Sequence, residues 1–310
     1  MAGGSEGSSA AILAAFLANV GIAIAKFVGF FITGSSALLA EAVHSVADSG
    51  NQGLLALGGR RAKRAPTTLH PFGYGRARYF WAFIVAVVLF SLGGLFSLYE
   101  GYHKVSDPHE VTSPVVAFVI LGVAIVFEAY ALRTAMKHAR PHLEGRGWIR
   151  YIRTSRSPEL PVLLLEDAGA LLGLVFATVG IALALITDNP IFDGIGTLAI
   201  GGLLVVIAIV LALEMSSLLL GEAATPEQLR EIETALTSGS EVRRLIHMAT
   251  HHLGPEQLLV GAKVEFDSAL SVRELAAAIN AAEHRVRAAV PAATVLYIEP
   301  DVLDPALVAG

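Results

Sequence analysis

The chain has 310 residues, of which 54% are hydrophobic and only 16% are charged, and its formal net charge is −5. Soluble domains carry about 25% charged residues, so this composition excludes an ordinary soluble protein and predicts a membrane protein with a soluble part. The sequence contains no cysteine, which excludes disulfide bonds and thiolate metal sites.

In chain order, residues 1–9 are predicted to be a disordered tail, residues 10–221 a transmembrane domain and residues 222–310 a cytoplasmic domain. An apolar stretch of about 20 residues is long enough to cross the hydrocarbon core as a helix. Six such stretches follow the tail, which predicts six transmembrane helices. They are residues 10–32, 36–59, 79–102, 114–136, 161–186 and 191–220.

Two connections between these stretches are rich in arginine and lysine, namely residues 60–78 and residues 137–156. Basic loops remain on the cytoplasmic side of a membrane, so both chain termini are expected in the cytoplasm. The N-terminus has no basic segment or cleavage site typical of a signal peptide, which favours a multi-pass protein of a bacterial inner membrane.

The second predicted span carries four polar residues on successive turns: Glu41, His44, Asp48 and Asn51. His44 and Asp48 are four residues apart, so both side chains lie on one helix face and could hold a divalent cation together. A polar seam that joins two helices is the alternative. Because a charge in the bilayer costs at least ~2.5 kcal/mol, four polar residues indicate a functional site.

Glu166 and Asp167 lie a turn or more inside the fifth span, where we expect a carboxylate to face His44 and Asp48. Adjacent helical residues point about 100° apart, so only one of the two is expected to face the site, and the sequence leaves open which one. Glu128 in the fourth span is a proton carrier, an acid beside the ligands, or a partner of Arg133.

Beyond residue 221 the pattern predicts the order helix, strand, strand, helix, strand. Capping signals start the two helices at Thr225 and Ser271. The expected ranges are 228–237, 242–251, 258–266, 271–290 and 293–298. This order is typical of a small two-layer α+β domain. This C-terminal part holds 13 acidic and 7 basic residues, which argues against nucleic acid as a partner.

The motifs GSSALLAEA, HSVADSGNQ and HPFGYGRARYFWAF, six spans and an αββαβ domain together resemble the cation diffusion facilitator family. The resemblance covers residues 19–300 and implies a ferredoxin-like cytoplasmic domain that dimerises. It also implies a homodimeric exporter of divalent cations, mostly zinc, that exchanges the metal for protons. His44 and Asp48 match the family's central metal ligands, and a histidine at the first position usually accompanies a preference for zinc.

The sequence departs from the family pattern in three places. The fifth span lacks the usual second pair of ligands, because Ala170 and Leu171 stand four residues beyond Glu166 and Asp167. This ED form is similar to a divergent branch that includes a mitochondrial zinc exporter. Secondly, Thr67 and Tyr74 replace loop ligands, which leaves His70 alone. Thirdly, the last strand ends in residues 297–300, Tyr-Ile-Glu-Pro, instead of the metal-binding histidines of the soluble domain.

The sequence therefore predicts a proton-coupled antiporter that exports Zn²⁺ or a similar metal and has no separate cofactor. His44 and Asp48 would bind the metal with Asp167 or Glu166 opposite, and Glu41, Asn51 or water could complete the ligand set. Two rivals remain: a metal-sensing or scaffolding membrane protein that binds without transport, and an intramembrane metalloenzyme. The enzyme is disfavoured because the sequence contains no HExxH or comparable motif.

Overall fold

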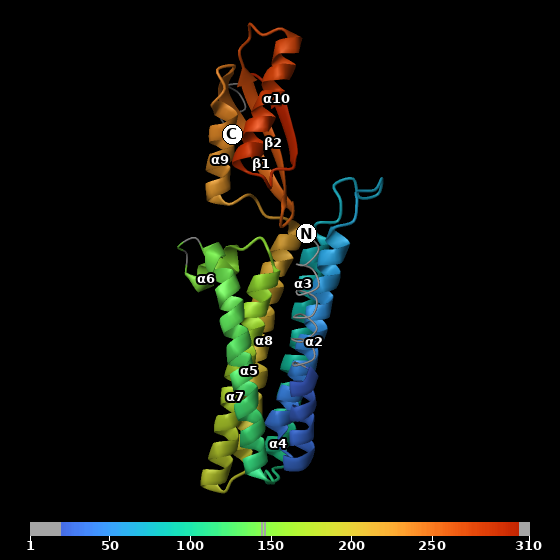
Figure 1. Ribbon diagram of the computed structural model, residues 1–310, viewed down its shortest axis with the longest axis vertical. Helices are drawn as coiled ribbons and strands as arrows, with labels where there is room; N and C mark the ends of the chain where they lie inside the picture. The colour runs from blue at the N-terminus through green and yellow to red at the C-terminus, as the bar shows by residue number, and fades with distance from the viewer. Residues whose placement is uncertain (1–19, 144, 146, 304–310) are drawn as a thin grey trace, which may run out of the picture. The chain divides into compact units, whose positions relative to one another are not determined.

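The computed structural model describes residues 20–143, 145 and 147–303 (Figure 1). The predicted tail, residues 1–9, and the beginning of the first predicted span lie outside these residues. The described chain falls into two compact units. One takes in the described residues up to Gly58 together with Phe80–Met215. The other takes in Gly59–Tyr79 and the described residues from Ser216 onward.

The first unit is a bundle of helices (Figure 1). A helix over Val20–Thr33 is followed by α2 (Ser36–Ala62), α3 (Ala77–Val88), the π-helix η1 (Leu89–Leu95) and α4 (Phe96–Ser106). Next come α5 (Pro114–Ala139), the short 3₁₀ helix η2 (Arg140–Leu143), α6 (Trp148–Thr154), α7 (Glu159–Thr187) and α8 (Ile191–Leu220). The prediction of a plain α-helix over residues 79–102 and of a loop over residues 137–156 missed η1 and α6.

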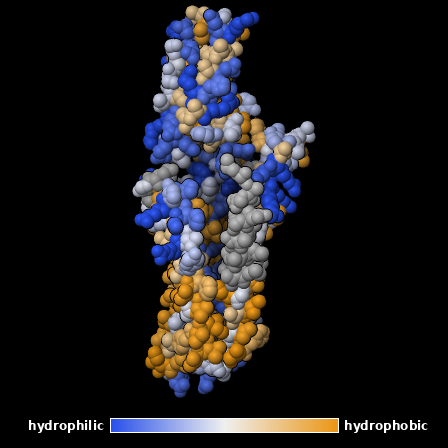
Figure 2. Space-filling view, in the orientation of Figure 1, coloured by the Kyte–Doolittle hydropathy of each residue, from blue (hydrophilic) through white to orange (hydrophobic). Residues whose placement is uncertain are grey.

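Within the described residues, four helical stretches are long and apolar enough to cross a membrane: Ala77–Ser106, Pro114–Leu143, Glu159–Thr187 and Ile191–Leu220. The 27-residue helix α2 is long enough but carries too many polar groups, and the described part of the first helix is short. Large apolar side chains such as Phe31, Val115 and Ile186 point outward. In Figure 2 hydrophobic residues gather over one part of the helical surface, in the lower part of the view, as expected for a surface in contact with lipid.

Glycines bring α4 and α8 into close contact. A Cβ atom on Gly101 would lie 2.7 Å from the backbone nitrogen of Leu198, and one on Gly201 would lie 2.7 Å from that of Leu98. Small residues allow membrane helices to approach this closely and to associate through van der Waals contacts. Helix α8 is thereby fixed against the helix that follows η1.

The second unit contains α9 (Pro226–Thr237), β1 (Val242–Gly254), β2 (Gln257–Phe266), α10 (Val272–Ala289) and β3 (Val295–Pro300). The order helix, strand, strand, helix, strand is the predicted one, and Thr225 and Ser271 form capping boxes. The sheet order is β1-β2-β3, with β2 antiparallel to β1 and parallel to β3. Alternate residues of β2 are buried in a core with α9 and α10.

The connection between α2 and α3 packs on the β1–β2 hairpin within this second unit. A Cβ atom on Gly75 would lie 2.7 Å from the carbonyl oxygen of Leu253, and Arg76 contacts the ring of His251. Where the family has loop ligands, the hydroxyls of Thr67 and Tyr74 lie 3.2 Å apart and form a hydrogen bond.

Candidate functional site

The centre of the candidate site is the face of α2 that carries His44 and Asp48. His44 Nε2 lies 3.5 Å from Asp48 Oδ2, one helical turn away, as the spacing predicts. The His44 side chain is 1% exposed and that of Asp48 is 18% exposed. Both ring nitrogens of His44 and Oδ1 of Asp48 are buried without a hydrogen-bond partner in the described structure. Buried polar atoms normally have hydrogen-bond partners, so the buried atoms without a partner at this position indicate a ligand site.

Helix α7 contributes Glu166 to this site. Asn51, one turn beyond Asp48, donates a hydrogen bond from Nδ2 to Glu166 Oε1 over 2.7 Å. Glu166 and Asn51 are buried, and Asn51 Oδ1 has no partner among the described residues. Asp167 is only partly buried. The structure therefore brings Glu166 to Asn51 of α2, whereas no hydrogen bond joins Asp167 to α2 among the described residues.

Glu128 lies on α5, which packs along α7, and it is partly buried. Its carboxylate acts through space on the charges of Asp48 and Asp167. No ion pair joins it to Arg133 among the described residues. The roles of Glu128 as a proton carrier or as an acid beside the ligands stay predictions.

Glu41 lies one turn before His44 on α2 and is paired with a lysine. Its Oε2 atom lies 3.0 Å from the ammonium nitrogen of Lys26 on the first helix, and the same nitrogen donates a hydrogen bond to Ser45 Oγ over 2.8 Å. Lys26, Glu41 and Ser45 are all buried. The sequence placed Lys26 in the first span but gave no signal that it pairs with Glu41.

The π-helix η1 lies next to His44. A Cβ atom on Gly93 would lie 3.6 Å from His44 Nδ1 and 3.2 Å from Leu204 of α8. Single turns of π-helix occur frequently at functional sites. The absence of a side chain at Gly93 leaves room beside the imidazole.

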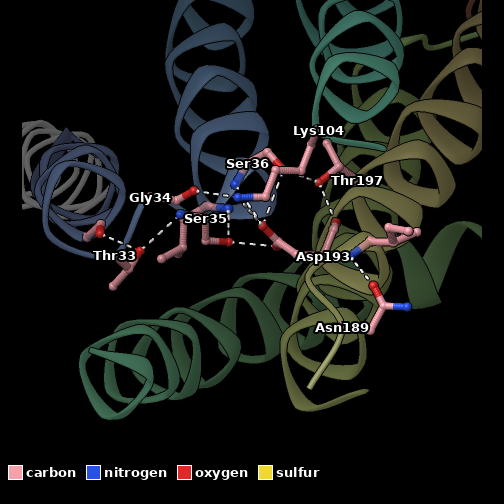
Figure 3. A network of polar contacts seen from close by, with 11 residues as sticks. Thr33, Gly34, Ser35, Ser36, Lys104, Asn189, Asp193 and Thr197 are labelled. Carbon is pink, nitrogen blue, oxygen red and sulfur yellow. Dashed lines mark hydrogen bonds and ion pairs between the residues drawn. The ribbon is translucent and has the colours of Figure 1, made fainter. Parts of the chain in front are cut away.

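Asp193 anchors the beginning of α2. Its carboxylate accepts hydrogen bonds from Ser35 Oγ at 2.8 Å and from the backbone N–H of Ser36 at 3.0 Å, and Lys104 Nζ lies 3.8 Å away (Figure 3). Thr197 bonds the Ser36 hydroxyl at 3.2 Å. Asp193 is thus fully buried, and although it lies in the first turn of α8 it caps the beginning of α2.

His252, near the end of β1, is 1% exposed, and its backbone N–H donates a hydrogen bond to the Glu222 carbonyl. No group of three histidine or acidic side chains in the described parts of the chain is close enough together to enclose a metal ion.

Apolar helices with exposed hydrophobic side chains, together with a buried imidazole and buried carboxylates, define a class: a helical membrane protein with polar groups inside its bundle. The family model for the cation efflux transmembrane domain matches residues 12–220. The chain therefore belongs to the cation efflux family, and within it to proteins related to the mitochondrial zinc exporter branch.

Three relatives illustrate this relationship. The mouse proton-coupled zinc antiporter SLC30A9, mitochondrial, is 34% identical over 250 residues, which are 80% of this chain and 44% of the relative. Metal tolerance protein C4 of Arabidopsis thaliana is 30% identical over 268 residues, 86% of this chain and 59% of the relative. Magnetosome protein MamB of Magnetospira sp. is 23% identical over 282 residues, 89% of each chain. The chain spans about half the length of the first two.

Proposed function

We propose that this protein is a proton-coupled antiporter that exports a divalent transition metal, Zn²⁺ foremost, from the cytoplasm. The observation that carries the proposal is the pair His44 and Asp48, whose buried polar atoms lack partners. One turn further along α2, Asn51 joins this helix to Glu166 of α7. An imidazole nitrogen with carboxylate oxygens is a ligand set that suits zinc. The relative SLC30A9 is named a proton-coupled zinc antiporter, which supports both zinc as the transported metal and coupling to protons.

His44 and Asp48 supply the first two ligands in this proposal, and Glu166 is the third. Asn51 Oδ1 or water completes the set, and Asp167 with Glu128 forms the acidic surroundings. In the described conformation the three ligand groups do not enclose an ion. We therefore expect α2 and α7 to approach each other when metal binds. Glu41 is not a ligand, since Lys26 holds its carboxylate.

Metal and protons compete for the same atoms in this site. Zinc needs a neutral imidazole and ionised carboxylates, so metal binding releases protons and protonation releases metal. Imidazole changes its charge close to neutral pH, which makes histidine suited to this exchange. Competition for one set of ligands therefore couples metal export to proton import.

The finer architecture is also part of the proposal. We assign residues 10–221 to six spans, including the helix Val20–Thr33 and α2, and residues 222–310 to a cytoplasmic ferredoxin-like domain through which two chains dimerise. The basic connections, residues 60–78 and 137–156, face the cytoplasm. Residence in a bacterial inner membrane stays a prediction from the sequence.

The test is zinc uptake into proteoliposomes that contain a zinc dye and a pH dye. Wild type and His44→Ala/Asp48→Ala are compared with a matched control, Asp107→Ala/His109→Ala, which removes an exposed aspartate and histidine. Zinc entry coupled to proton exit, lost only in the first variant, is expected. Unchanged flux in that variant would refute the site. Zinc binding without flux in wild type would identify a sensor instead.

A further inference from the structure

Lys26 is a fully buried ammonium within the helical unit. Its Nζ atom lies 3.0 Å from Glu41 Oε2 and 2.8 Å from Ser45 Oγ, so two consecutive turns of α2 hold it by oxygen atoms. A positive charge inside a membrane is costly and is usually retained for a function. The zinc site proposed above makes no use of this lysine.

Glu41 has a second oxygen that Lys26 does not bind. Oε1 is buried, has no hydrogen-bond partner among the described residues and lies against α7 at Gly173. An ionised carboxylate can accept about four hydrogen bonds or bind a cation with both oxygens. Glu41 and Ser45 therefore place their oxygen atoms around one position, which the ammonium group of Lys26 occupies in the described structure.

Stability does not explain this ion pair. A buried salt bridge often contributes nothing over an apolar pair of the same size, because desolvation of both charges offsets their attraction. Removal of one partner alone is strongly unfavourable, since the other charge then remains buried and uncompensated. Without Lys26, the Glu41 carboxylate needs another cation.

The pair is close to the proposed zinc ligands. Glu41 precedes His44 by three residues, which corresponds to a rise of about 4.5 Å along the helix. Ser45 is the next residue after His44, on the face turned toward the first helix. A cation bound by Glu41 and Ser45 would therefore lie beside a metal ion bound by His44.

We propose that Lys26 is a built-in cation that fills a latent second metal site formed by Glu41 and Ser45. Carboxylate and hydroxyl oxygens without imidazole suit a hard divalent cation such as Mn²⁺. By occupying this place, Lys26 restricts cargo to the imidazole-containing site and excludes a second, harder ion. The proposal deepens the proposed function, on which it rests, by naming a residue that determines specificity.

The test is a manganese titration of purified full-length protein, with free Mn²⁺ measured by electron paramagnetic resonance. Lys26→Gln removes the charge but keeps a hydrogen-bond donor for Glu41 and Ser45, and Lys26→Arg retains the charge. Lys26→Gln is expected to bind about one additional Mn²⁺ per chain, whereas Lys26→Arg matches wild type. The double variant Lys26→Gln/Glu41→Gln should lose the additional ion. Lys26→Met provides the same comparison if the glutamine variant does not fold.

The outcomes separate this inference from the proposed function. An additional ion in Lys26→Gln that disappears with Glu41→Gln supports the latent site. No additional ion, or one that persists in the double variant, would overturn it. Wild-type protein that binds no zinc contradicts the proposed function. The difference in manganese binding between wild type and Lys26→Gln still tests whether a metal ion can replace Lys26 beside Glu41.

Discussion

Asp193→Asn should destabilise the helical unit strongly although it changes only one atom of the side chain. The wild-type carboxylate accepts hydrogen bonds from Ser35 and Ser36 at the start of α2. An asparagine can keep its oxygen toward the Ser36 N–H and turn its amide toward the Ser35 hydroxyl, which can rotate to accept. The cap thus largely survives, and the principal loss is the negative charge beside Lys104.

The size of this loss follows from the geometry. Lys104 Nζ lies 3.8 Å from Asp193 Oδ2, and both side chains are almost completely buried. With an effective dielectric constant of about 20, two unit charges at this separation attract each other by about 4 kcal/mol. Breaking a buried ion pair by removing one partner costs about 3–5 kcal/mol, which agrees. Lys104 keeps one hydrogen bond, to the Gly34 carbonyl at 3.2 Å.

Unfolding in mixed micelles, followed by circular dichroism, measures the effect. The matched control is Asp188→Asn, the same chemical change at an exposed position, which should stay within about 0.5 kcal/mol of wild type. Lys104→Met/Asp193→Asn should recover most of the loss, because no uncompensated ammonium remains. If Asp193→Asn is as stable as Asp188→Asn, then leaving the Lys104 ammonium without its counter-charge does not destabilise the bundle, and the argument is refuted.

Three further predictions concern other parts of the chain. Gly173→Ala places a Cβ against Glu41 Oε1 and should cost about 1–3 kcal/mol by thermal unfolding, whereas Gly122→Ala meets nothing within 4 Å and should not destabilise. Thr225→Ala removes a capping box and should raise amide exchange in α9, equivalent to about 1 kcal/mol; unchanged exchange would contradict the cap. Burial and a neighbouring arginine lower the pKa of His251 below its usual 6.5, so the neutral ring is favoured in the folded state. Stability from this contact is therefore present above the usual pKa and declines as pH falls below it. Amide protection in β1, corrected for the intrinsic exchange rate at each pH, should therefore fall on acidification in wild type but not in His251→Gln.

The parts of the structure that the sequence predicts well depend on neighbours along the chain. His44 and Asp48 share a face because four residues make about one turn, and this holds wherever the helix lies. The capping boxes at Thr225 and Ser271 involve residues three apart, and both are confirmed. Strand β2 alternates buried and partly buried residues, so the sequence pattern also predicts which face of the strand lies in the core.

The parts that the sequence missed depend on how separate segments pack. Lys26 and Glu41 are 15 residues apart, and only the angle between two helices decides that they meet. The choice of Glu166 over Asp167 as the partner of Asn51 likewise depends on the rotation of α7. The π-helix next to His44 has no reliable residue signature, because it is one extra residue accommodated within an apolar run.

The cap on α2 can form only late in the synthesis of the chain. Ser36 and the aspartate that accepts its backbone N–H are 157 residues apart. Ribosomes add about 5–20 residues per second, so roughly 8–30 s separate the synthesis of the two. During that interval the first turn of α2 lacks its acceptor, and Lys104, once it has been made, lacks its counter-charge. Synthesis of α8 therefore completes the cap of the helix that carries His44, and a chain that stops before α8 leaves this cap unformed.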